Sequence, residues 1–142
     1  MVTRKNTAVA FIASLIAAGL VVFVTQVEAQ TIDEQKQALI GEWNGDWMGM
    51  GRAPATLIIH EIDTANAKAR CTYTSSTWGD RKFPVLADFI PGANPKLEFK
   101  VEGNDLKFVL KNKVLEGTFR GFNPTVGGLV SNTIKMGKKP EK

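Results

Sequence analysis

A short segment with two tryptophans most constrains how this 142-residue chain folds: residues 41–47, Gly-Glu-Trp-Asn-Gly-Asp-Trp. Trp43, Gly45 and Trp47 occupy alternate positions, so they share one face of an extended strand. We expect the two indoles to anchor one face of a sheet, and Gly45 leaves room between them for a close neighbour. We therefore expect the first strand of a β-domain here, with Trp43 and Gly45 as structural anchors.

Residues 1–29 predict a secretory signal peptide that is not part of the fold. Arg4 and Lys5 precede a mostly apolar, uncharged run over residues 8–24, and Val27 and Ala29 suit the last positions before a cut after Ala29. The sequence leaves an uncleaved anchor open, because the apolar run approaches the shortest bilayer span. We expect export to the periplasm or the medium, with no stable membrane insertion once the segment is cleaved.

Charge and cysteine content narrow the class of protein. The net charge is +4, and part of it lies in residues 137–142, which we expect to form a flexible basic tail. A basic stripe with interleaved aromatic residues is not visible, so nucleic acid is not an expected partner. The single cysteine, Cys71, alternates with Ala69 and Tyr73, which predicts a small buried hydrophobe. Pairing of Cys71 between two chains stays open.

One helix and eight strands account for the rest of the chain. Thr31 and Glu34 have the spacing of a capping box, which predicts a short helix within residues 30–40 that ends at Gly41. Residues 41–136 predict a β-domain, in which Pro84 suits an edge or a bulge and residues 121–128 a loop. The expected strands are 41–47, 55–62, 68–74, 83–90, 97–101, 106–110, 115–119 and 129–136.

The regular spacing of these strands predicts an antiparallel meander in an all-β protein. Closure into an eight-stranded antiparallel up-and-down barrel removes both sheet edges. It also leaves an interior just wide enough for side chains or one small ligand. A two-sheet sandwich is the alternative architecture.

The Gly-x-Trp start at Gly41–Trp43 and the meander that follows resemble the avidin and lipocalin group of exported, calycin-type β-barrels. The later segment 115–119, Leu-Glu-Gly-Thr-Phe, is similar to one that recurs in such barrels. The pattern also resembles small β domains that precede the catalytic domain of some exported bacterial serine hydrolases. This resemblance implies an open end that holds a ligand, Trp43 across the closed end, and a strand bend at Gly117. Gly45 stands where avidin-like proteins carry a polar ligand-binding residue, so biotin is not an expected ligand.

Three aromatic residues are the candidates for a ligand site: Trp47, Tyr73 and Trp78. Trp47 lies toward the far end of the first strand, and Trp78 lies in a loop where a large apolar ring needs cover. Tyr73, on the inner face near that loop, offers a hydroxyl partner. Plain packing of all three residues is the alternative.

Catalytic and metal signatures are not recognisable. His60 is the only histidine, and nothing in the sequence places a nucleophile beside it, so we expect a structural role. One histidine and one cysteine do not make a tetrahedral metal site, and no phosphate- or dinucleotide-binding pattern surrounds the glycines at 49 and 51. No catalytic residue, metal or cofactor is expected.

Three functional hypotheses remain. The first is an exported, non-enzymatic barrel that binds a small apolar or amphipathic molecule near Trp47, Tyr73 and Trp78. The second is an accessory or inhibitor module that binds another exported protein through its loops. The third, an enzyme that uses a barrel pocket, is the least favoured. A cavity in the interior supports the first hypothesis, and a filled interior supports the second.

Overall fold

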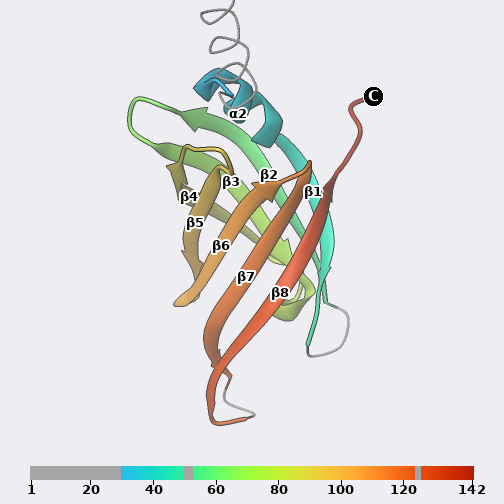
Figure 1. The fold of residues 1–142 in the computed structure, drawn as a ribbon. Coiled ribbons are helices and arrows are strands. Elements are labelled where there is room, and N and C mark those ends of the chain that lie inside the picture. The colour runs from blue at the N-terminus through green and yellow to red at the C-terminus, as the bar shows by residue number, and fades with distance from the viewer. Residues whose placement is uncertain (1–29, 50–52, 124–125) are drawn as a thin grey trace, which may run out of the picture. The chain divides into compact units, whose positions relative to one another are not determined.

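Eight antiparallel strands close into one barrel, each pairing with its sequence neighbour and β8 returning to β1 (Figure 1). The structure is a computed structural model that describes residues 30–49, 53–123 and 126–142. The predicted signal peptide lies outside the described residues. The all-β barrel is confirmed, and the two-sheet sandwich is excluded. The strands are β1 (Gly41–Trp47), β2 (Ala53–Asp63), β3 (Lys68–Ser75), β4 (Lys82–Ile90), β5 (Lys96–Val101), β6 (Asn104–Lys111), β7 (Val114–Asn123) and β8 (Gly128–Lys138).

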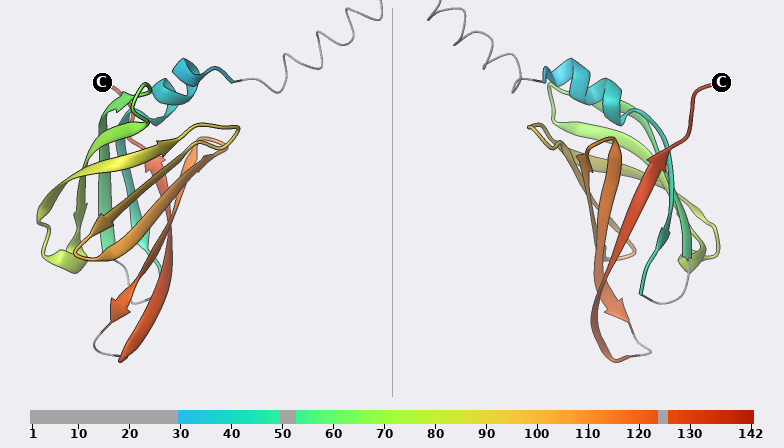
Figure 2. Two further views of the ribbon diagram at one scale, coloured as in Figure 1. Left: turned by 90° about the vertical axis from the view of Figure 1, so that its left-hand side faces the viewer. Right: turned by 45° about the vertical axis from the view of Figure 1, so that its right-hand side comes forward.

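Helix α2 (Ile32–Leu39) lies across one end of the barrel (Figure 2). The predicted capping box is present: Glu34 N donates to Thr31 Oγ1 at 3.1 Å, and Thr31 N donates to Glu34 Oε2. Leu39 is fully buried, and its carbonyl accepts a hydrogen bond from Trp43 Nε1 at 2.8 Å. The helix therefore covers the closed end, with Trp43 beneath it. None of the described residues forms a helix long and apolar enough to cross a bilayer.

The predicted role of Gly41 as the cap of that helix is wrong. Ile40 is already extended, and Gly41 is the first residue of β1, with φ at +138°. A side chain at Gly41 would also approach Lys138 Cε to 2.6 Å. Glycine is needed here because the chain turns directly from helix to strand in a conformation that other residues rarely adopt.

The interior is apolar and built from alternate residues of every strand. A Cβ at Gly45 would lie 2.4 Å from Lys135 O, and one at Gly117 would lie 2.5 Å from Phe108 Cε1. Both glycines therefore permit a close approach, which the sequence predicts at Gly45. The fully buried large side chains are Trp43, Tyr73, Phe108, Leu39, Leu57, Ile59, Ile62, Leu97, Leu106, Leu115, Ile134 and Met136.

The β7–β8 hairpin is longer than the sequence suggests and extends beyond the other strands at the end opposite α2 (Figures 1 and 2). The predicted loop at 121–128 is wrong for residues 121–123 and 128, because the ladder continues through Phe122↔Leu129 to Asn123↔Gly128. At its other end β8 includes Gly137 and Lys138, two residues of the expected tail, which pair with Asn44 and Trp43.

One opening in the backbone ladder lies between β4 and β5. Only three residue pairs join these strands, and the pair farthest from α2 is Asp88↔Glu98. Phe89 N donates to Ala67 O on the β3 side, so by alternation the nitrogen of Pro84 faces the unpaired side. The missing N–H of Pro84 therefore removes no ladder bond, as expected of an edge position.

Candidate functional site

Seven aromatic rings gather toward the end of the barrel opposite α2, and we call them the mouth cluster. Their members are Trp47, Tyr73, Trp78, Phe83, Phe99, Phe108 and Phe119. Six strands, β1 and β3 to β7, and the short 3-10 helix η1 (Ser76–Trp78) supply them. Neighbouring ring centroids lie 5.7–6.3 Å apart, mostly in edge-to-face or tilted pairs. Such geometry is favourable between aromatic quadrupoles, so the cluster stabilises this end of the interior.

The three predicted ligand residues lie together in this cluster. Trp47 Nε1 donates to Tyr73 Oη at 2.8 Å, and the rings of Tyr73 and Trp78 lie 6.0 Å apart. Trp47 is 5% exposed and Tyr73 is fully buried. The two buried polar groups satisfy each other, so both residues also serve as packing.

A short line of hydroxyl groups continues from Tyr73 toward the surface. Burial raises the pKa of Tyr73, and hydrogen bonds with the side chains of Trp47 and Ser75 partly offset that rise. Ser75 is fully buried; its Oγ donates to Thr77 Oγ1 at 3.2 Å and accepts from Thr77 N. Thr77 is exposed. Polar atoms thus run from the aromatic interior to solvent along η1.

Trp78 differs from the other two candidates because it is only half-buried and sits on η1 rather than on a strand. Its indole packs against Tyr73, Phe83 and Phe119, from β3, β4 and β7. It therefore covers the mouth cluster at the rim of the barrel, as the sequence predicts for a loop tryptophan that needs cover.

The sequence analysis did not single out the four phenylalanines of the cluster or Ser75. Their positions along the strands were the feature of the sequence that could have identified them. Phe99 and Phe119 fall on inward positions near strand ends that meet at this end of a closed meander. Phe83, at the start of β4, follows the same rule. Because the rule requires knowing which ends of the strands meet, the closed barrel was needed to apply it.

His60 lies on the outer face of the barrel, and Cys71 lies in its interior. A β-bulge between Ile59 and Glu61 turns His60 outward, where its Nε2 lies 2.7 Å from Thr72 Oγ1. Cys71 faces the interior, and burial raises the pKa of its thiol to about 12. Among the described residues no group of three His, Cys, Asp or Glu side chains is placed to hold a metal ion.

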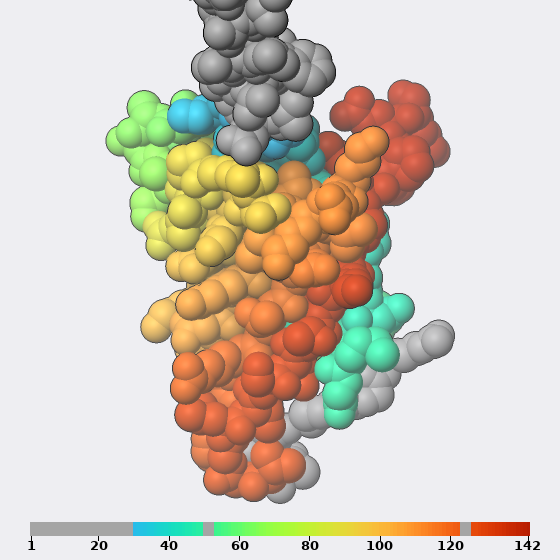
Figure 3. Space-filling model, viewed as in Figure 1, coloured from blue at the N-terminus to red at the C-terminus, as the bar shows by residue number. Residues whose placement is uncertain are grey.

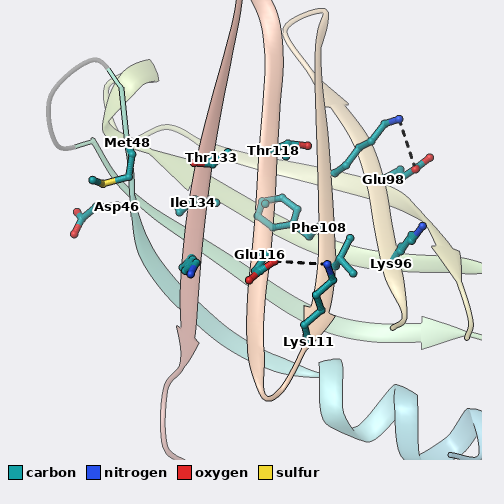
Figure 4. A pocket seen from close by; sticks show the side chains of 14 residues that line it. Asp46, Met48, Lys96, Glu98, Phe108, Lys111, Glu116, Thr118, Thr133 and Ile134 are labelled. Atoms are coloured by element: carbon teal, nitrogen blue, oxygen red, sulfur yellow. Dashed lines mark ion pairs between the residues drawn. The ribbon is translucent and has the colours of Figure 1, made fainter. Parts of the chain in front are cut away.

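A groove of about 830 Å³ lies on the outer face of β5 to β8. These strands face the viewer in Figure 3, and Figure 4 shows the groove from close by. Lys107 pairs with Glu98 at 3.9 Å and Lys111 with Glu116 at 4.0 Å. These distances are long and the side chains are solvated, so each pair contributes little. Opposite charges alternate across the strands, which gives the groove no single sign of charge to attract an ion. Its lining residues are Asp46, Met48, Lys96, Glu98, Lys107, Phe108, Val109, Lys111, Glu116, Gly117, Thr118, Thr133, Ile134 and Lys135.

The chemistry of the mouth cluster differs from that of this charged outer groove. Its side chains are aromatic or carry hydroxyls, and none is charged. Such a set recognises apolar surface by packing and a single polar group by hydrogen bonding. Comparison with protein families, with curated proteins and with solved structures finds no match to this chain.

Proposed function

We propose that this chain is an exported, non-enzymatic β-barrel that binds a small apolar or amphipathic molecule at the mouth cluster. The observation that carries the proposal is the meeting of Trp47, Tyr73 and Trp78 in one contiguous aromatic cluster at the end of the barrel opposite α2. Helix α2 covers the opposite end. A ligand therefore has one end of the barrel at which to enter.

The chemistry of the cluster supports an apolar ligand. Uncharged rings line the site, so transfer of an apolar molecule from water to it is favourable by about 25 cal/mol per Å² of apolar surface buried. The Tyr73 hydroxyl, which already accepts the hydrogen bond from Trp47 Nε1, is the group that we expect to meet one polar group of the ligand. A non-enzymatic role fits these residues, because the cluster contains no general base that titrates near neutral pH.

Native mass spectrometry of protein purified from the exported fraction without denaturation tests this proposal. We expect a mass that begins at Gln30 together with a retained small molecule. Tyr73→Phe, which removes the hydroxyl that accepts from Trp47 Nε1, should lower retention at least tenfold. Leu86→Ala, which removes an apolar side chain that is 65% exposed on the outer face of β4, should not. Protein that never retains a molecule, and whose melting temperature no apolar compound raises, would refute the proposal.

A second candidate function, an accessory module that binds another exported protein, has two observations in its favour. One is the interior, which apolar side chains fill. The other is on the surface. The end of the β7–β8 hairpin exposes large apolar side chains: Phe122 is 63% exposed, Val126 64% and Leu129 68%. Phe122 and Leu129 are directly paired across the hairpin. Contiguous exposed apolar surface of this kind is typical of a protein-binding site.

Chemical cross-linking in the exported fraction tests the second candidate. If a protein partner docks on the hairpin, the double variant Phe122→Ser, Leu129→Ser loses one specific cross-linked band. Leu86→Ser, an equally exposed leucine on β4, keeps it. A band that survives the double variant would exclude this hairpin as the docking site.

A further inference from the structure

The indole of Trp78, which η1 carries at the rim of the barrel, packs among the rings of Tyr73, Phe83 and Phe119. We propose that Trp78 is a built-in substitute for the ligand, and that the ligand is an uncharged, planar ring compound of about indole size that displaces it. This inference rests on the proposed function and names its ligand class.

The first support is the geometry around the indole. Tyr73, Phe83 and Phe119 contribute rings whose centroids lie 6.0, 5.9 and 5.9 Å from that of Trp78. Their planes are inclined to the indole plane by 70°, 76° and 53°. These three rings surround the place that the indole occupies, which we call the slot, and tilted or edge-to-face contacts with them favour a flat aromatic ring there.

The second support is the way in which Trp78 is mounted. The turn η1 has only three residues, and β3 ends at Ser75 while β4 begins at Lys82. The indole can therefore leave the slot without breaking a strand ladder. Gly79 and Asp80 have φ of +65° and +58°, and a Cβ at Gly79 would meet nothing within 4 Å. The backbone beside Trp78 thus has open space on the side of the turn.

The third support is the charge of the surroundings, which sets the ligand's own charge. Arg81 lies over the Phe83 ring at 4.9 Å and pairs with Glu102 at 3.4 Å, and both charged side chains are largely in solvent. The slot itself holds aromatic carbon and the Tyr73 hydroxyl. A charged ring would lose its hydration here without gaining a counter-ion, which favours a neutral ligand.

Replacement of the indole by an added one is the direct test. Trp78→Gly empties the slot, and indole is the probe. We expect indole to bind Trp78→Gly saturably, as followed by amide chemical shifts around Tyr73 and Phe119, and at least tenfold more weakly to the wild type. Indole-5-carboxylate should bind the variant at least tenfold more weakly than indole. Equal indole binding by wild type and variant, or none by a folded variant, overturns the inference, and equal binding of the carboxylate overturns the neutral ligand class.

A measurement on the wild-type chain keeps the test decisive if Trp78→Gly does not fold. With 5-fluorotryptophan incorporated, the three tryptophans give three ¹⁹F signals. Added indole should move the Trp78 signal toward its solvent-exposed position and leave the Trp43 signal unchanged. A Trp78 signal that does not move at saturating indole overturns the inference. If the purified protein retains a small molecule in this case, the proposed function stands while the substitute role of Trp78 fails.

Discussion

Gly117 shows how a single missing side chain fixes the packing of three strands. A Cβ at this position would lie 2.5 Å from Phe108 Cε1 and 2.6 Å from Ile134 Cγ2, both fully enclosed in the interior. Phe108 in turn stacks on Phe99 and touches Trp47, so a displaced Phe108 would disturb the mouth cluster. Gly117 is therefore needed because the absence of a side chain lets Phe108 and Ile134 pack closely beside it.

We expect Gly117→Ala to lower the free energy of unfolding by about 1–3 kcal/mol, the usual cost of overpacking a filled core. Chemical denaturation followed by tryptophan fluorescence measures the loss. Gly137→Ala is the matched control: it lies in β8, and its Cβ would meet nothing within 4 Å. A loss at Gly117 no larger than at Gly137 would show that Phe108 relaxes without cost.

Ionisation of the Cys71 thiol makes the free energy of unfolding depend on pH in the alkaline range. Burial raises its pKa from an ordinary value of 9.0 to about 12 in the folded chain. The unfolded chain therefore loses the thiol proton first. Between about pH 9 and 12 the folded state holds a proton that the unfolded state has released, and stability falls as pH rises. Below pH 9 the thiol is protonated in both states, so its contribution to the free energy of unfolding is fully present.

Above pH 9 we expect the free energy of unfolding to fall by up to about 1.4 kcal/mol per pH unit from this group. Comparison with Cys71→Ala isolates the effect, because Tyr73 also has a raised pKa and titrates in both proteins. The difference in stability between the two chains should narrow as pH rises from 9 to 10. A constant difference would mean that the thiol ionises equally in both states.

At the scale of elements, α2 and the end of β8 hold each other in place. Lys138 Nζ donates to the carbonyls of Gln37 and Ala38 at 3.3 Å and lies 5.8 Å from the Trp43 ring. These carbonyls end the helix, where a cation is favourable. Lys139 N donates to Glu42 O and continues the junction with β1.

A chain that ends at Met136 should therefore be less stable by about 2 kcal/mol, since it loses two ladder pairs and the cap of α2. A chain that ends at Lys139 retains these contacts and should match the full chain within about 0.5 kcal/mol. Thermal unfolding of the three lengths measures the difference. Equal stability of all three would make the last residues of β8 dispensable.

Local sequence predicted most elements, and the failures have a common physical cause. Thr31 and Glu34 sufficed for the helix start, since a capping box is satisfied within four residues. The β7–β8 loop was misjudged because Gly121 and Pro124 read as turn residues, whereas the facing strand extends the ladder to Asn123↔Gly128. Trp47, Tyr73 and Trp78 were found from type and position, but the rings between them depended on barrel closure.

At the scale of the whole molecule, one pairing differs from the rest. Seven of the eight strand pairs join neighbours in sequence, and only β1–β8 joins the two ends of the barrel. Closing the chain between Trp43 and Lys138 costs about 2 kcal/mol more in loop entropy than joining Phe108 to Gly117, on a logarithmic dependence on length. The β1–β8 contacts are therefore expected to form late in folding.

The two variants argued above should consequently differ in folding kinetics. Gly117→Ala perturbs the local β6–β7–β8 meander, so part of its destabilisation should slow refolding, with a φ-value above about 0.5. The chain ending at Met136 loses contacts of the closure alone, so its destabilisation should appear almost wholly as faster unfolding, with a φ-value below about 0.3. Stopped-flow chevron plots measure both. If the chain that ends at Met136 instead refolds more slowly, β1–β8 pairing is already formed in the transition state. The barrel would then close before its meander is complete.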